Sequence, residues 1–280
     1  MTENQQAKVW NETVGEAWVE HADQFDTTLE PFGNAALGLL GVKFGDRVVD
    51  IGCGTGATTR AIALLSDPGQ VTGVDVSTTM LAAARHRSAV LANVTYVECD
   101  VETTPLGSRL FDVAFSRFGV MFFSDPTRAF TNVFESLVSR GRLGFVCFQA
   151  PPLNPFIVVP IMAAAPHLSM GPPAGPNDPS PFSLADPSRI GSILAMAGFV
   201  DVDIVPGPTE AILANDSDLT TVARRLLEQN PGTATGFSTA TAANRDAAIS
   251  AAADALAPHQ IGGRLALPAA TWLVTATADK

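Results

Sequence analysis

The stretch that most constrains this fold is residues 48–56, which read Val-Val-Asp-Ile-Gly-Cys-Gly-Thr-Gly. A β-branched run leads into three glycines at alternate positions, and residues 57–65 then have a helical pattern. Glycines at such a turn let the backbone bend tightly and approach a ligand without a Cβ in the way, and the free N–H groups of the following helix point at the same place. The stretch therefore predicts a strand, a ligand-binding loop and a helix, with a small-molecule cofactor at the loop.

A second signal comes at the end of the next apolar run, where Asp75 lies 19 positions after Gly56. A carboxylate at the tip of the strand beside a glycine loop can accept both hydroxyls of a ribose. The same rule holds for NAD-binding proteins, and a lone Asp at a strand end is more often a helix cap. The combination with the glycine loop favours the ribose role here.

The glycine spacing, G-x-G-x-G after Asp50, differs from the G-x-G-x-x-G of a dinucleotide fingerprint. It resembles the first motif of the class I S-adenosylmethionine (SAM)-dependent methyltransferases, typically D-x-G-x-G-x-G, in their small-molecule type. The resemblance covers about residues 45–150 and, more loosely, 184–205. It implies a Rossmann-like α/β fold whose mixed sheet has seven strands in the order 3-2-1-4-5-7-6, the last antiparallel, with helical cap insertions. It also implies SAM as the cofactor and S-adenosylhomocysteine (SAH) as its product.

Apolar runs and helical patterns alternate from Arg47 to Phe148, which is the signature of βαβ units and a parallel sheet. We expect strands at about 47–51, 70–75, 94–99, 110–116, 142–148, 199–205 and 269–277 and helices at about 58–66, 77–90, 126–138 and 187–198.

Three further segments are expected, one before the core and two inserted into it. They are an N-terminal helical lid at 1–40, a Pro-rich insertion at 150–183 and a helical cap insertion at 211–263, so that the core is 41–210 and 264–280. The prolines exclude a long helix in the insertion. Lid and cap are expected above the carboxyl edge of the sheet, where ligands bind in open α/β folds.

The resemblance assigns the cofactor to residues at the ends of the first four strands: Asp50, Gly52, Cys53, Gly54, Gly56, Asp75, Val76, Met80, Asp100, Val101 and Ser116. Asp50 and Gly52 are expected near the methionine part of SAM, with a carboxylate or a backbone carbonyl facing its ammonium group. Asp100 matches the acidic position that commonly binds the adenine amino group, and Glu98 and Glu102 are the alternatives.

The turn at residues 116–123 is very apolar for a segment leaving a strand, and in the family the equivalent turn runs toward the acceptor. The candidate substrate residues are Trp18, Arg117, Phe118 and Met121. Two plainer interpretations stay open: the rings here and in the lid are ordinary core, and Arg117 forms an ion pair with a neighbouring carboxylate. The catalytic residue stays unknown, with His21, His167 and Arg117 as candidates.

Charge and composition exclude several other classes. Lys and Arg total 17 against 28 Asp and Glu, a net charge of −11, which disfavours a nucleic-acid partner. No apolar stretch approaches the roughly 20 residues of a membrane span, and the polar N-terminus lacks the basic region of a signal peptide, so we expect no membrane association and a cytoplasmic location. The three cysteines form no C-x-x-C pair and the histidines do not cluster, which indicates neither a disulfide nor a metal site.

We therefore predict a SAM-dependent methyltransferase that acts by direct displacement on a small, apolar and uncharged or cationic metabolite, as a monomer or a homodimer. An NAD-dependent oxidoreductase and a non-catalytic SAM-binding regulatory protein are the alternatives. The sequence leaves open which molecule is the acceptor and whether an oxygen, nitrogen or carbon is methylated.

Overall fold

The protein is described by a computed structural model of residues 5–175, 178–216 and 218–280. The first four residues of the predicted lid, residues 176 and 177 of the Pro-rich insertion and residue 217 of the cap lie outside the described residues. None of the helices in these described ranges is long and apolar enough to cross a bilayer.

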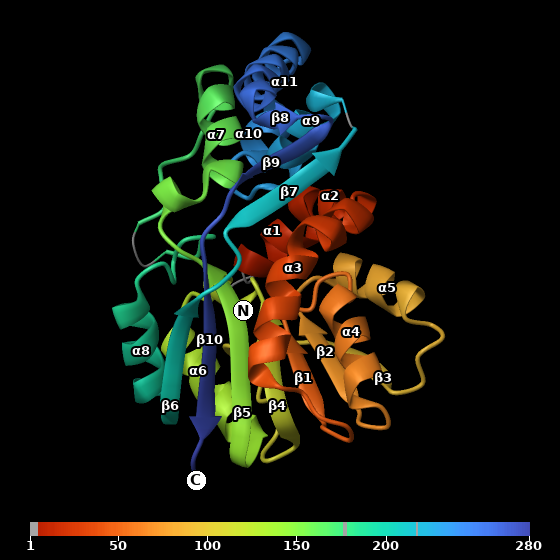
Figure 1. The fold of residues 1–280 in the computed structure, drawn as a ribbon, viewed down its shortest axis with the longest axis vertical. Helices are drawn as coiled ribbons and strands as arrows, with labels where there is room; N and C mark the ends of the chain where they lie inside the picture. The colour runs from red at the N-terminus through yellow and green to blue at the C-terminus, as the bar shows by residue number, and fades with distance from the viewer. Residues whose placement is uncertain (1–4, 176–177, 217) are drawn as a thin grey trace.

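The core is a seven-stranded sheet in the order β3-β2-β1-β4-β5-β10-β6 (Figure 1). Its strands are β1 (Val48–Ile51), β2 (Val71–Asp75), β3 (Val94–Glu98), β4 (Phe111–Arg117), β5 (Leu137–Phe148), β6 (Phe199–Pro206) and β10 (Thr271–Ala278). Strands β1 to β5 pair in parallel, whereas β10, the seventh of these strands along the chain, pairs antiparallel with both β5 and β6. The predicted strand order and fold class are confirmed.

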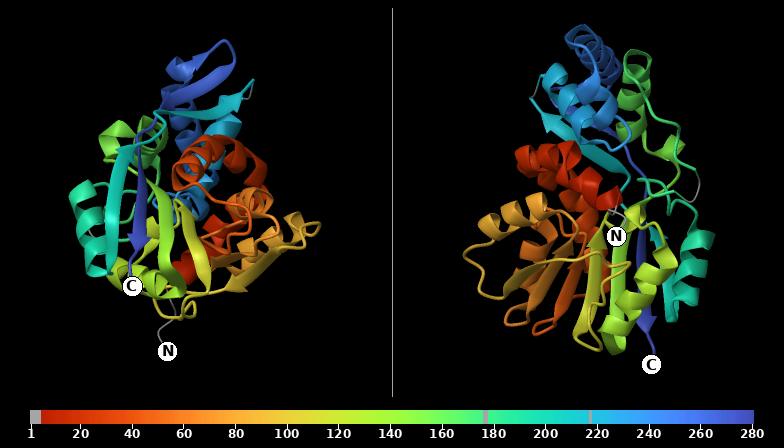
Figure 2. Two further views of the ribbon diagram at one scale, coloured as in Figure 1. Left: turned by 60° about the horizontal axis from the view of Figure 1, so that its bottom comes forward. Right: turned by 180° about the vertical axis from the view of Figure 1, so that it is seen from behind.

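Helices cover both faces of this sheet. In Figure 1, α3 (Ala22–Leu40) and α4 (Ala57–Ser66) lie in front of it, with α5 (Thr78–Arg87) beside them, whereas α6 (Pro126–Ser136) and α8 (Pro187–Met196) come forward in the rear view of Figure 2. The apolar runs of the strands face both layers, so Phe115 and Phe145 are fully buried. The start of α6 follows from its residues, because Asp125 accepts a hydrogen bond from the N–H of Arg128 at 3.0 Å and Pro126 fills the first turn.

The N-terminal segment forms three helices, α1 (Gln5–Asn11), α2 (Thr13–Glu20) and α3. The side chain of Asn11 fastens α1 to the exit of β2, because its Nδ2 donates to the carbonyl of Val76 at 3.3 Å and its Oδ1 accepts from the hydroxyl of Thr78 at 2.9 Å. The lid is thereby attached next to the predicted cofactor loop.

Above the carboxyl edge of the sheet lies a second, three-stranded sheet, β7-β9-β8, that the sequence analysis did not predict. Its strands are β7 (Glu210–Asn215), β8 (Gln260–Ile261) and β9 (Arg264–Pro268), and the helices of this region are α7 (Pro155–Ala164), α9 (Leu219–Gln229), α10 (Ala234–Thr239) and α11 (Ala242–Leu256). The cap is therefore mixed α/β. Residues 264–268, expected in the core, pair with β7 in the cap sheet instead.

The Pro-rich insertion contains the ten-residue helix α7, which the sequence analysis did not predict although it excluded only a long helix. Pro155 occupies its first turn, where the missing N–H breaks no intrahelical hydrogen bond, and α7 packs against α11. The remaining short helical turns are η1 (Val120–Phe122), η2 (Pro151–Leu153), η3 (Ala165–His167) and η4 (Ala257–His259).

Candidate active site

The loop after β1 needs glycine for two physical reasons. Gly52, Gly54 and Gly56 have φ of 63°, 53° and 79°, in the left-handed region that other residues rarely adopt. A Cβ on Gly52 would also lie 2.8 Å from the Cα of Gly119, so this loop and the turn after β4 approach each other backbone to backbone. The sequence motif thus produces a tight loop at the carboxyl edge of the sheet.

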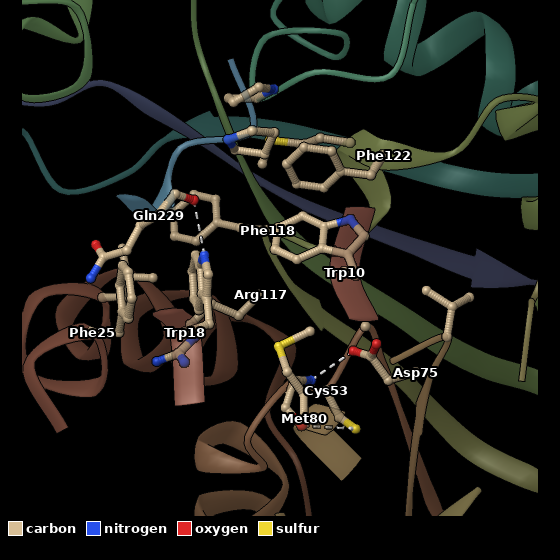
Figure 3. A pocket seen from close by; sticks show the side chains of 18 of the residues that line it. Trp10, Trp18, Phe25, Cys53, Asp75, Met80, Arg117, Phe118, Phe122 and Gln229 are labelled. Carbon is tan, nitrogen blue, oxygen red and sulfur yellow. Dashed lines mark hydrogen bonds between the residues drawn. The ribbon is translucent and has the colours of Figure 1, made fainter. Parts of the chain in front are cut away.

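The carboxylate of Asp75 holds this loop from the end of β2. It accepts hydrogen bonds from the N–H of Gly54 at 2.8 Å (Figure 3) and from the N–H of Ser77 at 2.9 Å. Burial raises the pKa of Asp75, and the backbone hydrogen bonds oppose that rise. A carboxylate has about four lone-pair sites, so two remain for ligand hydroxyls.

A cavity of about 230 Å³ lies over the glycine loop, between the core and the cap. Its lining contains most of the predicted site residues, namely Trp18, Gly52, Cys53, Gly54, Asp75, Val76, Met80, Asp100, Val101, Arg117, Phe118 and Met121. The acidic side chains in this lining are Asp75 at the end of β2 and Asp100 and Glu102 in the loop after β3. Glu98, the other alternative for the adenine contact, does not line the cavity.

The opposite side of the cavity is built from aromatic rings (Figure 3). Trp18 stacks on Phe25 with 3.8 Å between ring centroids, and Trp10 meets Phe122 edge to face at 5.0 Å. Phe118, from the turn after β4, stacks on a neighbouring phenylalanine of β5 at 4.1 Å. Further apolar lining comes from α7 and α9: Phe156, Ile157, Pro160, Ile161 and Leu226.

With this geometry in view, comparisons with known proteins decide the family. Residues 49–145 match the family described as "Methyltransferase domain". This segment belongs to the class I SAM-dependent methyltransferases. The matched range contains the glycine loop, Asp75, Asp100 and the turn after β4, so the predicted family is confirmed on the residues that carried the resemblance, and SAM is the cofactor that this domain implies.

The curated relatives match part of this chain. The ubiquinone/menaquinone biosynthesis C-methyltransferase UbiE of Pasteurella multocida is 33% identical over 119 residues, which are 41% of this chain and 44% of the relative. Its counterpart from Yersinia enterocolitica is 31% identical and is covered to 47%. The chain thus spans less than half the length of the curated relatives it matches.

Solved structures resemble the whole chain in fold. A phosphoethanolamine N-methyltransferase 2 of Haemonchus contortus, solved with SAM, has a TM-score of 0.61 at 18% identity and covers all of this chain and 61% of its own. The YcgJ protein of Bacillus subtilis has a TM-score of 0.56 at 19% identity, with 88% of this chain and 99% of its own covered. At such identities the likeness shows the fold alone.

Three predicted cofactor residues of the methyltransferase domain do not line the cavity. Asp50 is buried behind it, where one carboxylate oxygen accepts from the hydroxyls of Thr58 at 2.7 Å and Thr59 at 2.6 Å. The other oxygen has no hydrogen-bond partner, and burial raises the pKa of Asp50 to about 6. Its carboxylate therefore stabilises the start of α4. Thr58, one of the two threonines that it binds, lines the cavity.

Ser116 and Gly56 likewise stabilise the glycine loop from outside the cavity. The hydroxyl of Ser116 donates to the carbonyl of Ile51 at 2.7 Å and accepts from the N–H of Gly119 at 3.2 Å. It therefore fastens the glycine loop to the turn after β4. A Cβ on Gly56 would lie 2.3 Å from the hydroxyl oxygen of Tyr96, so this glycine makes room for a ring beneath the loop.

Arg117 lines the cavity, but its charge is already partnered. Its Nη2 lies 3.4 Å from a carboxylate oxygen of Asp26 on α3, the ion pair that the sequence analysis gave as the plainer interpretation. Asp26 also accepts from Arg87 at 2.8 Å and from Arg60 at 3.3 Å. Burial lowers the pKa of Arg117, while Asp26 and Asp50 raise it. The cluster joins α3 to α4, α5 and β4.

The two histidine candidates lie elsewhere. His21 is 3.7 Å from a carboxylate oxygen of Glu228, a contact between the lid and α9, and His167 ends η3. Within the described part of the chain, the cavity lining includes no histidine, lysine or tyrosine. Neither candidate histidine is part of this lining.

Sequence reasoning named the segments that build the aromatic side but missed individual residues there. Phe156, Ile157, Leu226 and Gln229 lie on helices whose facing is set by how lid, insertion and cap pack together. The one available signal was the concentration of rings in the lid, since Trp10 and Trp18 both line the cavity.

Proposed function

We propose that this chain is a SAM-dependent methyltransferase whose acceptor is a small, predominantly apolar and uncharged molecule. The observation that supports it is one continuous cavity, which runs from the glycine loop and Asp75 of a class I domain into an apolar chamber under the lid and cap. One end of the cavity is polar and the other is apolar. A site that binds a polar cofactor beside an apolar acceptor needs this difference.

The residues present fit SAM. The backbone of Gly52 and Gly54 can approach the methionine part, Asp75 has lone pairs left for the ribose hydroxyls, and Asp100 or Glu102 lines the cavity on the side of the adenine. When bound, SAM supplies a sulfonium methyl group open to nucleophilic attack. Asp50, Gly56 and Ser116 act in this proposal by keeping the loop in shape.

The aromatic chamber positions the acceptor and excludes water. Displacement needs an acceptor lone pair in line with the methyl carbon: the new bond to carbon forms, and the electrons of the broken carbon–sulfur bond stay on sulfur. No histidine, lysine or tyrosine of the described residues lines the cavity, so placement and desolvation carry the displacement, and a proton that the acceptor loses passes to a lining carboxylate or to solvent. Arg117, paired with Asp26, can orient a polar group but cannot accept a proton.

The relatives support methyl transfer as the reaction but do not identify the acceptor. The name of UbiE describes a carbon methyltransferase of quinone biosynthesis, but the match lies over less than half of that protein. We propose that the lid (1–40), the Pro-rich insertion (150–183) and the cap (211–263) select the acceptor. A cytoplasmic location and a monomeric or homodimeric state belong to the same proposal.

Calorimetry with SAM, SAH and NAD tests the cofactor first. We expect micromolar dissociation constants for SAM and SAH and no NAD binding; tight NAD binding without SAM binding would refute the proposal. Methyl-labelled SAM with a panel of uncharged aromatic and aliphatic acceptors then tests turnover. SAM binding with no SAH formed from any member of the panel would favour the non-catalytic alternative.

A further inference from the structure

Arg117 is the one cationic side chain, among the residues that the structure describes, that lines the cavity over the glycine loop. SAM, which the residues of this cavity fit, carries a carboxylate on its methionine part as well as the hydroxyls of its ribose. An anionic group that leaves water needs a charged or hydrogen-bonding partner. In this lining the partner has to come from Arg117 or from free backbone N–H groups.

Arg117 lies on the side of the cavity that the methionine part of SAM would occupy. In Figure 3 Arg117 lies below Trp18, whereas Asp75 lies on the opposite side of the view, with Cys53 of the glycine loop between them. SAM carries its carboxylate at the end remote from its adenosine, so a ribose at Asp75 directs the carboxylate across the loop. The start of α4 lines the cavity through Thr58, and no side chain caps this helix, so its free N–H groups favour negative charge nearby.

The ion pair with Asp26 leaves most of the guanidinium of Arg117 unused. Its Nη2 lies 3.4 Å from Asp26, whereas Arg87 reaches the same carboxylate at 2.8 Å. The other two nitrogens of Arg117 donate to no described residue, and they are not closed off, unlike the Nε of Arg87, which is buried without a partner. The Arg117 side chain stays 11% exposed. A guanidinium has five N–H donors in a fork that matches a carboxylate, so Arg117 has donors left for a second one.

Neighbouring helices fix the direction of the Arg117 side chain. A Cβ on Gly33 of α3 would lie 3.0 Å from its Cδ and 3.6 Å from the methyl group of Thr58, so the stem passes between α3 and the start of α4. Arg117 and Thr58 also line a second cavity, of about 380 Å³, whose lining includes Asp26 and Arg87. Arg117 therefore reaches from the Asp26 cluster to the cofactor cavity, whereas Arg87 lines the second cavity alone.

We propose that Arg117 binds the methionine carboxylate of SAM and SAH and so selects the complete cofactor over adenosine ligands that lack this group. The inference rests on the proposed function, because it takes SAM as the ligand of the cavity. It gives Arg117 a role in cofactor binding rather than in the acceptor site for which the sequence analysis named it. Since Asp26 belongs to the lid, the same guanidinium joins the lid to the bound cofactor.

The test removes the carboxylate from the ligand and the charge from the protein. Titration calorimetry on the full chain compares SAH, decarboxylated SAH and methylthioadenosine, which lacks the whole amino-acid part. We expect wild-type protein to bind SAH roughly 10- to 100-fold more tightly than decarboxylated SAH. Arg117→Met keeps an unbranched stem but loses the charge, so this ratio should fall roughly tenfold while methylthioadenosine binds as before.

The control is Arg87→Met, which removes the same charge from the same Asp26 cluster at a residue outside the cofactor cavity and should keep the wild-type ratio. Arg117→Gln, whose amide can still donate to Asp26, should show the same fall as Arg117→Met and replaces it if that variant does not fold.

Three results overturn the inference: equal binding of SAH and decarboxylated SAH by wild-type protein, a wild-type ratio in a folded neutral variant of Arg117, or the same fall in Arg87→Met. An equal weakening of all three ligands in Arg117→Met also overturns it, because that result shows a structural role alone. Failure of the proposed function is read separately, since wild-type protein would then bind neither SAM nor SAH.

Discussion

The two ends of the cavity are built by different kinds of sequence. The cofactor end comes from about 70 consecutive residues, 50–122, and is held by backbone hydrogen bonds to Asp75 and by the hydroxyl of Ser116. The acceptor end is assembled from the lid, the turn after β4, the Pro-rich insertion and the cap. Packing between aromatic rings dominates it, and a hydrogen bond from Trp18 to Gln229 joins lid and cap. A polar, locally encoded site therefore faces an apolar site that exists only once distant segments have packed.

We propose that the two ends have separate tasks. A loop between two neighbouring strands can hold the same cofactor below different caps, because the hydrogen bond from Gly54 to Asp75 lies within the methyltransferase domain. The acceptor chamber can change with α7, α9 or the lid without altering that loop. Variants at one end should therefore leave the other end intact, and the predictions below set out to break this separation.

The largest effect is expected from Gly52→Ala in the glycine loop. The change places a Cβ 2.8 Å from the Cα of Gly119 at a residue with φ of 63°, so clash and backbone strain combine. We expect a loss of about 3 kcal/mol in the free energy of unfolding, measured in urea, together with weaker SAH binding. The matched change Gly38→Ala on α3 meets no atom within 4 Å and should instead stabilise the protein by roughly 0.5 to 1 kcal/mol. Equal stabilities of the two variants would mean that the close approach of the loops is unimportant.

Asp75→Ala should act on the cofactor more than on the fold. We expect the dissociation constant of SAH to rise roughly 10- to 100-fold, since the ribose loses a charged acceptor and the N–H of Gly54 loses its partner. Asp186, the N-cap of α8, makes a similar hydrogen bond to the residue two positions on, accepting from the N–H of Ser188 at 2.9 Å, and it is not part of the cavity lining. Asp186→Ala should lower stability without changing SAH affinity; titration calorimetry separates the two. An unchanged constant in folded Asp75→Ala would reduce Asp75 to a helix cap.

The Asp26 cluster tests the joint between lid and cofactor domain. Asp26→Asn keeps the size of the side chain but removes the charge that faces Arg60, Arg87 and Arg117. We expect a loss of about 1 to 2 kcal/mol in unfolding free energy, less than for a fully buried pair because the Asp26 side chain is 20% exposed. Glu210→Gln, which removes the exposed pair with Arg264, should produce no measurable change. Similar effects of both variants would show that the cluster adds nothing beyond a surface ion pair.

The same contrast explains what could be predicted from the sequence. The glycine spacing, the acid at the end of β2 and the alternation of strands and helices are local signals, and the sheet order that they implied is confirmed. The cap sheet was missed because β8 has two residues and β9 has five, too short to display a clear alternation, and because β7 lies far from its partner in sequence.

Individual site residues failed prediction for another physical reason. The motif places Asp50 next to the glycine loop, but its side chain points to the hydroxyls of Thr58 and Thr59 rather than into the cavity. Alternation along a strand could not show this, because β1 is buried on both faces. Gln229 was missed since a polar residue at a helix end ordinarily faces water, whereas here it is buried and its carbonyl accepts a hydrogen bond from Trp18 of the lid.

The smallest expected effect is a pH dependence of the free energy of unfolding, which comes from the buried Asp50 beside the glycine loop. Burial raises the pKa of Asp50 from its ordinary value of 3.8 to about 6, so between these values the folded protein binds more protons than the unfolded chain. Stability contributed by this group must therefore rise as pH falls from 7 to 5, by about 1 kcal/mol. Asp50→Asn cannot titrate, so the difference between wild type and variant reports Asp50 together with its electrostatic coupling to Asp75. Urea unfolding at both pH values measures it. A difference that stays constant, or that moves against wild type at pH 5, would mean that Asp50 is charged in the fold and that a positive group, such as Arg117, compensates for its burial more strongly than its position indicates.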